Sequence, residues 1–186
     1  IGRRHTPEQI EEAYAMAREE GFDNINMDLI LGLPEETPDD VRRTMEKLTE
    51  MAPDSITVHS LAVKRAARLN TMKEQYAHLK FENTEEMMNL TADYCRRLGL
   101  VPYYLYRQKN MAGNFENVGY AKPGRAGIYN ILIMEEKQSI MALGAGSTTK
   151  AVFPDGRIER CDNVKDIDQY LGRIQEMIDR KRKLLS

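Results

Sequence analysis

The sequence predicts an α/β fold in which parallel strands alternate with helices, as in part of a strand–helix barrel. Aliphatic strand segments and amphipathic helix segments follow one another, with one strand–helix unit about every thirty residues. Such alternation is typical of parallel strands joined by right-handed crossovers. Roughly three to five units fit into 186 residues, so the chain is too short to close a barrel of eight strands.

The helices of the first half are predicted from their starting signals. Two starts combine a Thr N-cap, a proline at the first helical position and a capping-box side chain, and the third has a cap residue alone. They are Thr6-Pro7-Glu8-Gln9, Thr37-Pro38-Asp39-Asp40 and Asn83 or Thr84. The helices end at Gly21, before Pro53 and at Gly99, because glycine and proline are the usual stop signals.

Three aliphatic segments are predicted to be strands. They cover residues 25–33, 55–61 and 101–106. The stretch 64–80 is polar and loosely patterned, which indicates a long and partly helical excursion between the second strand and the third helix.

The second half of the chain has a different character. Residues 110–127 are rich in Gly, Asn and Lys, as expected for a loop that faces a substrate. The further elements predicted are strands at 128–135 and 139–143, a hairpin at 152–160 and a helix at 166–185. The hairpin rests on the turn signal Pro154-Asp155-Gly156.

Composition narrows the class of protein. The 186 residues are 41% hydrophobic and 30% charged, which is typical of a globular chain with a real core. A net charge of −2 argues against a dedicated nucleic-acid-binding protein. No apolar run approaches the roughly 20 residues that span a bilayer. Cys95 and Cys161 stand far apart and belong to no metal-spaced motif, which favours free thiols in a cytoplasmic protein.

The most informative stretch is Asn26-Met27-Asp28-Leu29-Ile30-Leu31-Gly32-Leu33-Pro34, which puts a carboxylate inside an apolar strand. A strand of this aliphatic content is predicted to be buried on both faces, where an Asp is costly unless hydrogen-bond donors meet it. Gly32 and Pro34 end the strand and let the backbone approach a ligand. Asp28 is therefore a candidate for holding ligand hydroxyls. The alternative is a pairing with a neighbouring Arg that fixes the register of the strands.

Two more positions near element ends are candidates for ligand binding. Gly2-Arg3-Arg4-His5-Thr6 puts two guanidinium groups before a helix N-terminus, where they either grip a carboxylate or are simply solvated. Ala62 ends the segment Val58-His59-Ser60-Leu61-Ala62. A small residue after a strand lets a flat ring lie against the backbone, although the residues alone favour an Ala that serves ordinary packing.

Two motifs of the second half are also compatible with ligand binding. Leu143-Gly144-Ala145-Gly146-Ser147-Thr148-Thr149 is a glycine-rich turn without a P-loop lysine, so nucleotide hydrolysis is disfavoured, but a cofactor can approach its bare backbone. Tyr103-Tyr104-Leu105-Tyr106-Arg107-Gln108-Lys109-Asn110 combines aromatic faces with two cations. That set suits a flat, carboxylate-bearing ligand or, alternatively, a strand with one buried aromatic face. No complete catalytic constellation is present.

Together these segments resemble the oxygen-independent coproporphyrinogen III oxidase family of radical S-adenosylmethionine enzymes. The segments that carry the resemblance are Gly2–Thr6, Asn26–Pro34 with Thr37-Pro38 after it, and Leu143–Ser147. The loop Tyr106–Tyr120 looks like that of the coproporphyrinogen dehydrogenase subgroup. The resemblance covers essentially the whole chain.

The resemblance implies the C-terminal half of a partial barrel of six strand–helix units, the (β/α)6 radical SAM barrel, followed by a short hairpin and a C-terminal helix. The family binds S-adenosylmethionine on a 4Fe-4S cluster and takes electrons from an external donor. A 5′-deoxyadenosyl radical then abstracts hydrogen from a propionate side chain of coproporphyrinogen III, and oxidative decarboxylation to vinyls gives protoporphyrinogen IX. We therefore divide the chain into a barrel part, residues 1–150 with a substrate-side loop at 106–127, and a following segment, residues 151–186.

The family's CxxxCxxC cluster motif and the first half of the barrel are missing from this sequence, and neither Cys95 nor Cys161 replaces the motif. The chain also opens on Ile1 rather than Met. We expect a piece of a longer protein that is inactive by itself. Its partners would be the missing N-terminal half of the same chain, the tetrapyrrole substrate and the electron donor. Without the upstream strands, the open edge of the first strand favours self-association.

Position by position, the resemblance assigns four residues to the S-adenosylmethionine site and no catalytic side chain. Arg3 matches the family arginine, and Asp28 matches the aspartate that meets the ribose hydroxyls. Ala62 matches the residue whose backbone meets the adenine. Thr149, or its neighbour Thr148, falls near the last contact. The competing functions are a heme-chaperone relative, against which the loop Tyr106–Tyr120 argues, and a non-catalytic ligand-binding or assembly half-barrel.

Overall fold

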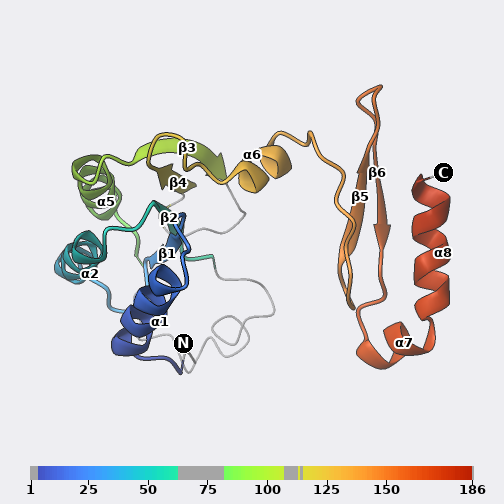
Figure 1. Ribbon diagram of the computed structural model, residues 1–186, viewed down its shortest axis with the longest axis horizontal. Helices are drawn as coiled ribbons and strands as arrows, with labels where there is room; N and C mark the ends of the chain where they lie inside the picture. The colour runs from blue at the N-terminus through green and yellow to red at the C-terminus, as the bar shows by residue number, and fades with distance from the viewer. Residues whose placement is uncertain (1–3, 63–81, 107–112, 114, 186) are drawn as a thin grey trace. The chain divides into compact units, whose positions relative to one another are not determined.

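The computed structural model describes residues 4–62, 82–106, 113 and 115–185. The chain forms two compact units, Ile1–Gly127 and Ile128–Ser186, and Figure 1 labels the elements of each. The boundary expected from the sequence, after residue 150, falls inside the strand β5 (Thr148–Val152). The functional division of the chain into a barrel part and a following segment stays a prediction. The excursion expected at 64–80 lies outside the described residues.

The first unit is built on a four-stranded sheet. Its order is β1 (Asn26–Leu31), β2 (Ser55–Ser60), β4 (Asn117–Ala121) and β3 (Val101–Tyr106). The strands β1 and β2 are parallel, as predicted. The strand β4 runs antiparallel to both of its neighbours, β2 and β3.

The strand β4 corrects the prediction of a continuous loop over residues 110–127. All five residues of Asn117–Ala121 are buried between the second and third predicted strands. Their sequence, Asn-Val-Gly-Tyr-Ala, has no aliphatic run, so local pattern gave no strand signal. Pairing on both edges stabilises this segment as a strand, and that pairing is a tertiary effect.

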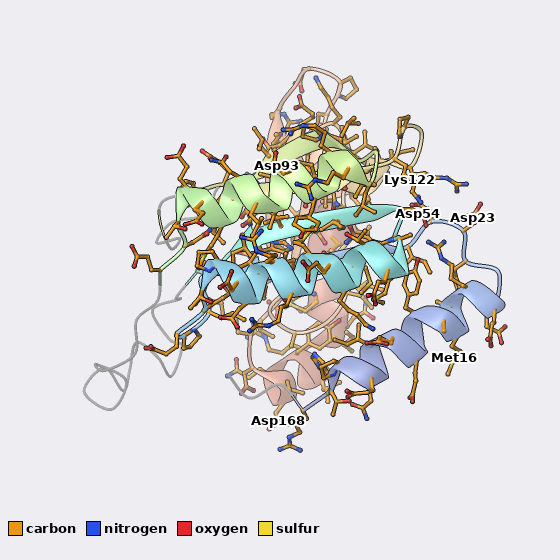
Figure 2. All side chains as sticks on the ribbon, turned by 90° about the vertical axis from the view of Figure 1, so that its left-hand side faces the viewer. Met16, Asp23, Asp54, Asp93, Lys122 and Asp168 are labelled. Atoms are coloured by element: carbon orange, nitrogen blue, oxygen red, sulfur yellow. The ribbon has the colours of Figure 1, made fainter. Side chains whose placement is uncertain are left out.

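Three helices of the first unit begin where their caps predicted. They are α1 (Pro7–Glu19), α2 (Pro38–Met51) and α5 (Glu85–Arg97). Capping boxes form at Thr6 and Thr37, and the Thr84 side chain accepts from the N–H of Met87. Figure 2 shows α2 and α5 side by side over the strands. Their buried side chains and those of the sheet form one core, with Leu31, Val41, Met45, Ile56, Val58, Met87 and Cys95 at its centre.

The two faces of the sheet differ. In β1, Met27, Leu29 and Leu31 pack in or against the core, whereas Asn26 and Asp28 are exposed. The prediction that this strand is buried on both faces was therefore wrong for the described part of the chain. The helices α2 and α5 cover one face, and a strand needs a second layer to be buried on the other.

Asp54, just before β2, ties the sheet to the first helix. Its Oδ2 atom accepts from the N–H of Ile25 at 3.0 Å and lies 2.6 Å from Nη2 of Arg18, while its Oδ1 atom accepts from Nζ of Lys122 at 3.0 Å. Figure 2 shows Asp54 and Lys122 at the same end of the strands. Burial by itself raises the pKa of this carboxyl, but the bonds from Ile25, Lys122 and Arg18 outweigh it and hold the pKa at about 2.

The second unit contains the predicted hairpin, formed by β5 and β6 (Ile158–Asp162). The helix α8 (Ile174–Leu185) packs along this hairpin, as Figure 1 shows. The single helix expected over 166–185 is broken at Arg173 into α7 (Ile167–Gly172) and α8, because Gly172 weakens the helix there.

Two strands predicted in this unit were wrong. Residues 128–135 form a short helix, α6 (Ile128–Met134), because a short apolar run fits a helix and a strand equally well by its periodicity. Residues 139–143 contain only an isolated bridge between Ile140 and Lys150. In the described residues, no helix is long and apolar enough to cross a membrane.

We predict that Asp54→Asn lowers the free energy of unfolding by about 2 kcal/mol near neutral pH, the equivalent of its pKa shift. The amide keeps an acceptor for Ile25 but loses the attraction of Arg18 and Lys122. Because the folded pKa of about 2 lies below the usual 3.8, this stability is complete above pH 4 and disappears as the pH falls toward 2. Urea unfolding at several pH values measures the difference.

The control is Asp93→Asn, on the exposed side of α5, where Asp93 pairs with Arg96 at 2.7 Å. An exposed pair contributes about 0.5 kcal/mol. Equal losses in the two variants would contradict a special role for Asp54.

We also predict that the 186-residue chain self-associates. In the described part of the chain, β1 and β3 are the edge strands of the sheet, and an open edge offers unpaired backbone groups to another copy. Light scattering should give an apparent mass that rises with concentration. A strict monomer at every concentration would contradict the prediction.

Candidate functional site

A row of residues crosses the whole sheet of the first unit. The strand register places Asp28 opposite Thr57, Thr57 opposite Gly119, and Gly119 opposite Tyr104. The row lies on the face that α2 and α5 do not cover, because its residues alternate with the core residues of the same strands. Asn26 and His59 belong to the same face, two residues away from Asp28 and Thr57 along their strands.

Asp28 is held by neighbours in β1 and β2. Nδ2 of Asn26 donates to Oδ1 of Asp28 at 2.7 Å, and Nε2 of His59 lies 3.7 Å from the same oxygen. The nearby imidazole of His59 lowers the pKa of Asp28, burial opposes this, and the hydrogen bond from Asn26 lowers the pKa further. Asp28 is thus ionised at neutral pH. Among the described residues its partners are Asn26 and His59, and none is the Arg of the alternative interpretation.

Thr57 links this pair to the rest of the row. Its Oγ1 donates to Oδ1 of Asn26 at 3.1 Å, and its hydroxyl lies close enough to Tyr104 to lower the pKa of that phenol. Burial raises the pKa of Tyr104 more than Thr57 lowers it, and the charge of Asp28 raises the pKa further. The phenol therefore stays protonated and can serve as a hydrogen-bond donor.

Tyr104 lies flat on the sheet because of two local features of β3 and β4. The register shifts between Pro102 and Tyr104, so Tyr103 is an extra residue of the kind found in a β-bulge. The rings of Tyr103 and Tyr104 are 4.9 Å apart between centroids and are inclined at 57°. Gly119 lies under them, and a Cβ there would come within 2.0 Å of the Tyr104 ring.

This surface offers a carboxylate acceptor, an amide and a half-buried aromatic ring to solvent, whereas Thr57 is buried between them. The side chain of Asp28 is 65% exposed and that of His59 33%, so a ligand can reach both. A carboxylate has about four lone-pair sites, so Asp28 can accept further bonds from the hydroxyls of a sugar. The surface suits a ligand that carries both hydroxyl groups and a flat ring.

The other three residues predicted to bind the cofactor do not belong to this row. Arg3 lies outside the described residues, as do residues 107–112 and 114 of the predicted loop. Ala62 follows β2 and is half-buried. Thr149 belongs to the second unit, where its buried hydroxyl accepts from the N–H of Ala142 at 3.1 Å. Thr148 Oγ1 donates to Oδ1 of Asp162 at 2.6 Å. The assignment of Arg3, Asp28, Ala62 and Thr149 to one ligand stays a prediction.

The glycine-rich turn of the second unit is held by hydrogen bonds to other residues of the same unit. The carbonyl of Gly144 accepts from Oγ of Ser147 and from Nδ2 of Asn163, both at 2.8 Å. The N–H of Gly144 donates to the hydroxyl of Tyr170 at 3.1 Å. Gly144 and Gly146 have φ values of 95° and 71°, which favour glycine. Their backbone conformation accounts for these two glycines without a ligand.

The described residues contain no ligand set for a metal cluster. They include no group of three or more His, Cys, Asp or Glu side chains close enough to hold a metal ion. Cys95 is buried in the core, and burial raises the pKa of its thiol to about 12. Cys161 lies in β6 of the second unit. A 4Fe-4S cluster thus has no donor set in this part of the chain.

Sequence reasoning identified Asp28 but missed Asn26, Thr57 and Gly119 as parts of the same site. A signal was present, because β1 and β2 alternate polar and apolar residues in Asn26-Met27-Asp28-Leu29 and in Thr57-Val58-His59. The contribution of Gly119 had no local signal, since it depends on a ring from another strand.

Comparisons with known proteins agree with these features. The family model described as "Radical SAM superfamily" matches residues 1–48. The oxygen-independent coproporphyrinogen-III oxidase-like protein HemZ of Bacillus subtilis is 44% identical over 186 residues, which are 100% of this chain and 37% of that protein. The oxygen-independent coproporphyrinogen III oxidase of Salmonella typhimurium is 37% identical over 162 residues, 86% of this chain and 34% of that protein. The heme chaperone HemW of Haemophilus influenzae is 25% identical over 171 residues, 92% of this chain and 41% of that protein.

The solved structure of coproporphyrinogen III oxidase (HemN) from Escherichia coli matches with a TM-score of 0.65 at 19% identity, over 95% of this chain and 39% of that one. This likeness shows the fold, which is a part of the radical SAM barrel, as predicted. The chain spans 37% of the length of HemZ and 39% of that of HemN. The chain therefore belongs to the radical SAM superfamily, as a segment similar over its whole length to the oxygen-independent coproporphyrinogen-III oxidase-like protein HemZ.

Proposed function

We propose that this chain is part of an oxygen-independent coproporphyrinogen III oxidase. The reaction is the oxidative decarboxylation of propionates of coproporphyrinogen III to vinyls, which gives protoporphyrinogen IX in heme biosynthesis. The observation that carries the proposal is 44% identity to HemZ over every residue of the chain. The polar row of the sheet supports it, because it offers the acceptors that an adenosyl ligand needs.

In this proposal the uncovered face around Asp28 holds S-adenosylmethionine. The ionised and exposed carboxylate accepts from the ribose hydroxyls, while Asn26 and His59 keep it oriented. The family resemblance assigns the backbone at Ala62 to the adenine and Arg3 and Thr149 to further contacts, and these assignments stay predictions. When bound to a reduced cluster, S-adenosylmethionine supplies the adenosyl group that takes a hydrogen atom from the substrate.

The proposed activity belongs to a longer protein. The described residues hold no donor set for a 4Fe-4S cluster, so the cluster ligands come from the missing N-terminal half, and this segment alone is inactive. Further partners are the tetrapyrrole substrate and an external electron donor. We propose a cytoplasmic protein that contacts neither a membrane nor nucleic acid.

We predict that Asp28→Asn in the full-length protein weakens S-adenosylmethionine binding roughly 10- to 100-fold. The neutral amide loses hydrogen bonds that a charged acceptor makes stronger. Because the pKa of Asp28 is lowered, the wild-type affinity stays constant through neutral pH and decreases only in acid, as the carboxylate takes up a proton. Isothermal titration at several pH values measures both effects.

Asp23→Asn is the matched control, because Asp23 is similarly exposed and pairs with Arg125 at 3.0 Å. Its affinity for S-adenosylmethionine should equal that of the wild type. Equal affinities for wild type, Asp28→Asn and Asp23→Asn would overturn the cofactor site.

A second candidate function is that of a heme chaperone, because the heme chaperone HemW of Haemophilus influenzae matches over 92% of this chain. The full-length protein with its reconstituted cluster separates the two. We expect carbon dioxide and vinyl products from coproporphyrinogen III and no stable heme complex. Tight heme binding without decarboxylation would replace the oxidase proposal by the chaperone.

A further inference from the structure

We propose that Tyr104 is a positioning residue for Asp28, which it reaches across the sheet through Thr57 and Asn26. The inference rests on the proposed function, in which Asp28 binds S-adenosylmethionine. It assigns a part in cofactor binding to a strand, β3, that does not touch β1. The observations that carry it are the register of the row, the glycine under the ring, and the hydrogen bonds from Thr57 to Asn26 and from Asn26 to Asp28.

The register leaves one route for Tyr104 to reach Thr57. The strand β4 lies between β3 and β2, so the two residues are separated by two strand spacings, about 10 Å. A tyrosine side chain covers this distance only when it lies flat across the intervening strand. The position on β4 that faces both Tyr104 and Thr57 is Gly119.

Gly119 is required by the ring and not by its own backbone. Its φ angle lies outside the positive region that glycine alone enters easily, so other residues fit the strand conformation there. A Cβ at this position would lie 2.0 Å and 2.3 Å from two atoms of the Tyr104 ring. Any side chain would therefore lift the ring from the sheet and separate its hydroxyl from Thr57.

The hydrogen bonds then run in one direction toward the carboxylate. Asn26 donates to Asp28 at 2.7 Å, and Thr57 donates to Asn26 at 3.1 Å. The hydroxyl of Thr57 has a single hydrogen, so its oxygen remains free to accept another bond. In this proposal the donor is the phenol of Tyr104, whose ring lies over Gly119, the residue opposite Thr57. A chain of donors that ends on an anion is mutually reinforcing. Tyr104 thereby fixes Thr57, and through Asn26 it fixes the orientation of Asp28.

The test is Tyr104→Phe in the full-length protein, because it keeps the ring and removes only the hydroxyl. We expect affinity for S-adenosylmethionine to decrease about 3- to 10-fold. The decrease in affinity at acid pH should begin at a higher pH than in the wild type, because the ionised carboxylate of Asp28 is less well stabilised. Gly119→Ala should weaken binding at least as much, because it lifts the ring.

Tyr94→Phe is the matched control on the helix-covered face. It removes a hydroxyl bonded to Glu46 at 3.3 Å, so it changes stability but leaves the affinity and its pH profile as in the wild type. In the double variant Asp28→Asn with Tyr104→Phe, the effect of the tyrosine should vanish, because the carboxylate it positions is gone.

The two hypotheses fail in different ways. If Asp28→Asn binds as tightly as the wild type, the proposed cofactor site is wrong. If Asp28→Asn weakens binding while Tyr104→Phe keeps the wild-type affinity and pH profile, only the positioning role is overturned. An effect of Tyr104→Phe that persists unchanged in the Asp28→Asn background also overturns it, because it would then be a general loss of packing.

Discussion

One buried carboxylate, that of Asp54, holds three segments of the first unit together. Asp54 binds the backbone of Ile25 before β1, the guanidinium group of Arg18 in α1 and the amine of Lys122 after β4. These three bonds set where the neighbouring elements stand relative to β2. A slip of one residue between strands exchanges the faces of a sheet. Such a slip would place Asp28 on the helix-covered face. The polar face of the sheet therefore depends on the bonds that Asp54 makes.

The division of the sheet into two faces explains how an Asp is tolerated in an aliphatic strand. The helices α2 and α5 take the apolar residues of β1 and β2 on one side. On the other side Asp28 keeps contact with water and gains Asn26 and His59 as partners, so it avoids the cost of a buried charge. The same exposure that stabilises Asp28 in this segment makes it available to a ligand.

Similarity to known proteins identifies the superfamily and the fold, whereas the geometry of the sheet identifies candidate side chains for cofactor binding. The family model at residues 1–48, together with similarity to HemZ over the whole chain, gives the superfamily, and the likeness to HemN at 19% identity gives the fold. Neither identifies the side chains that bind a cofactor. That step rests on a row of residues from four strands, together with the physical chemistry of a carboxylate beside hydroxyl and amide donors. The row spans the sheet because Gly119 leaves room for Tyr104.

The sequence by itself determined the features that depend on near neighbours. Local signals predicted the caps at Thr6, Thr37 and Thr84, because the hydrogen bonds of a cap form within three residues. The alternation of strands and helices predicted that β1 and β2 are parallel. The helix at Ile128–Met134 buries no residue, and the sequence missed it because a short apolar run fits a helix and a strand equally well. Tertiary structure alone decided that Asn117–Ala121 enters the sheet, because pairing with β2 and β3 on both edges selects its strand conformation. The site follows the same rule, since a ring from one strand and a glycine from another meet only after the chain has folded.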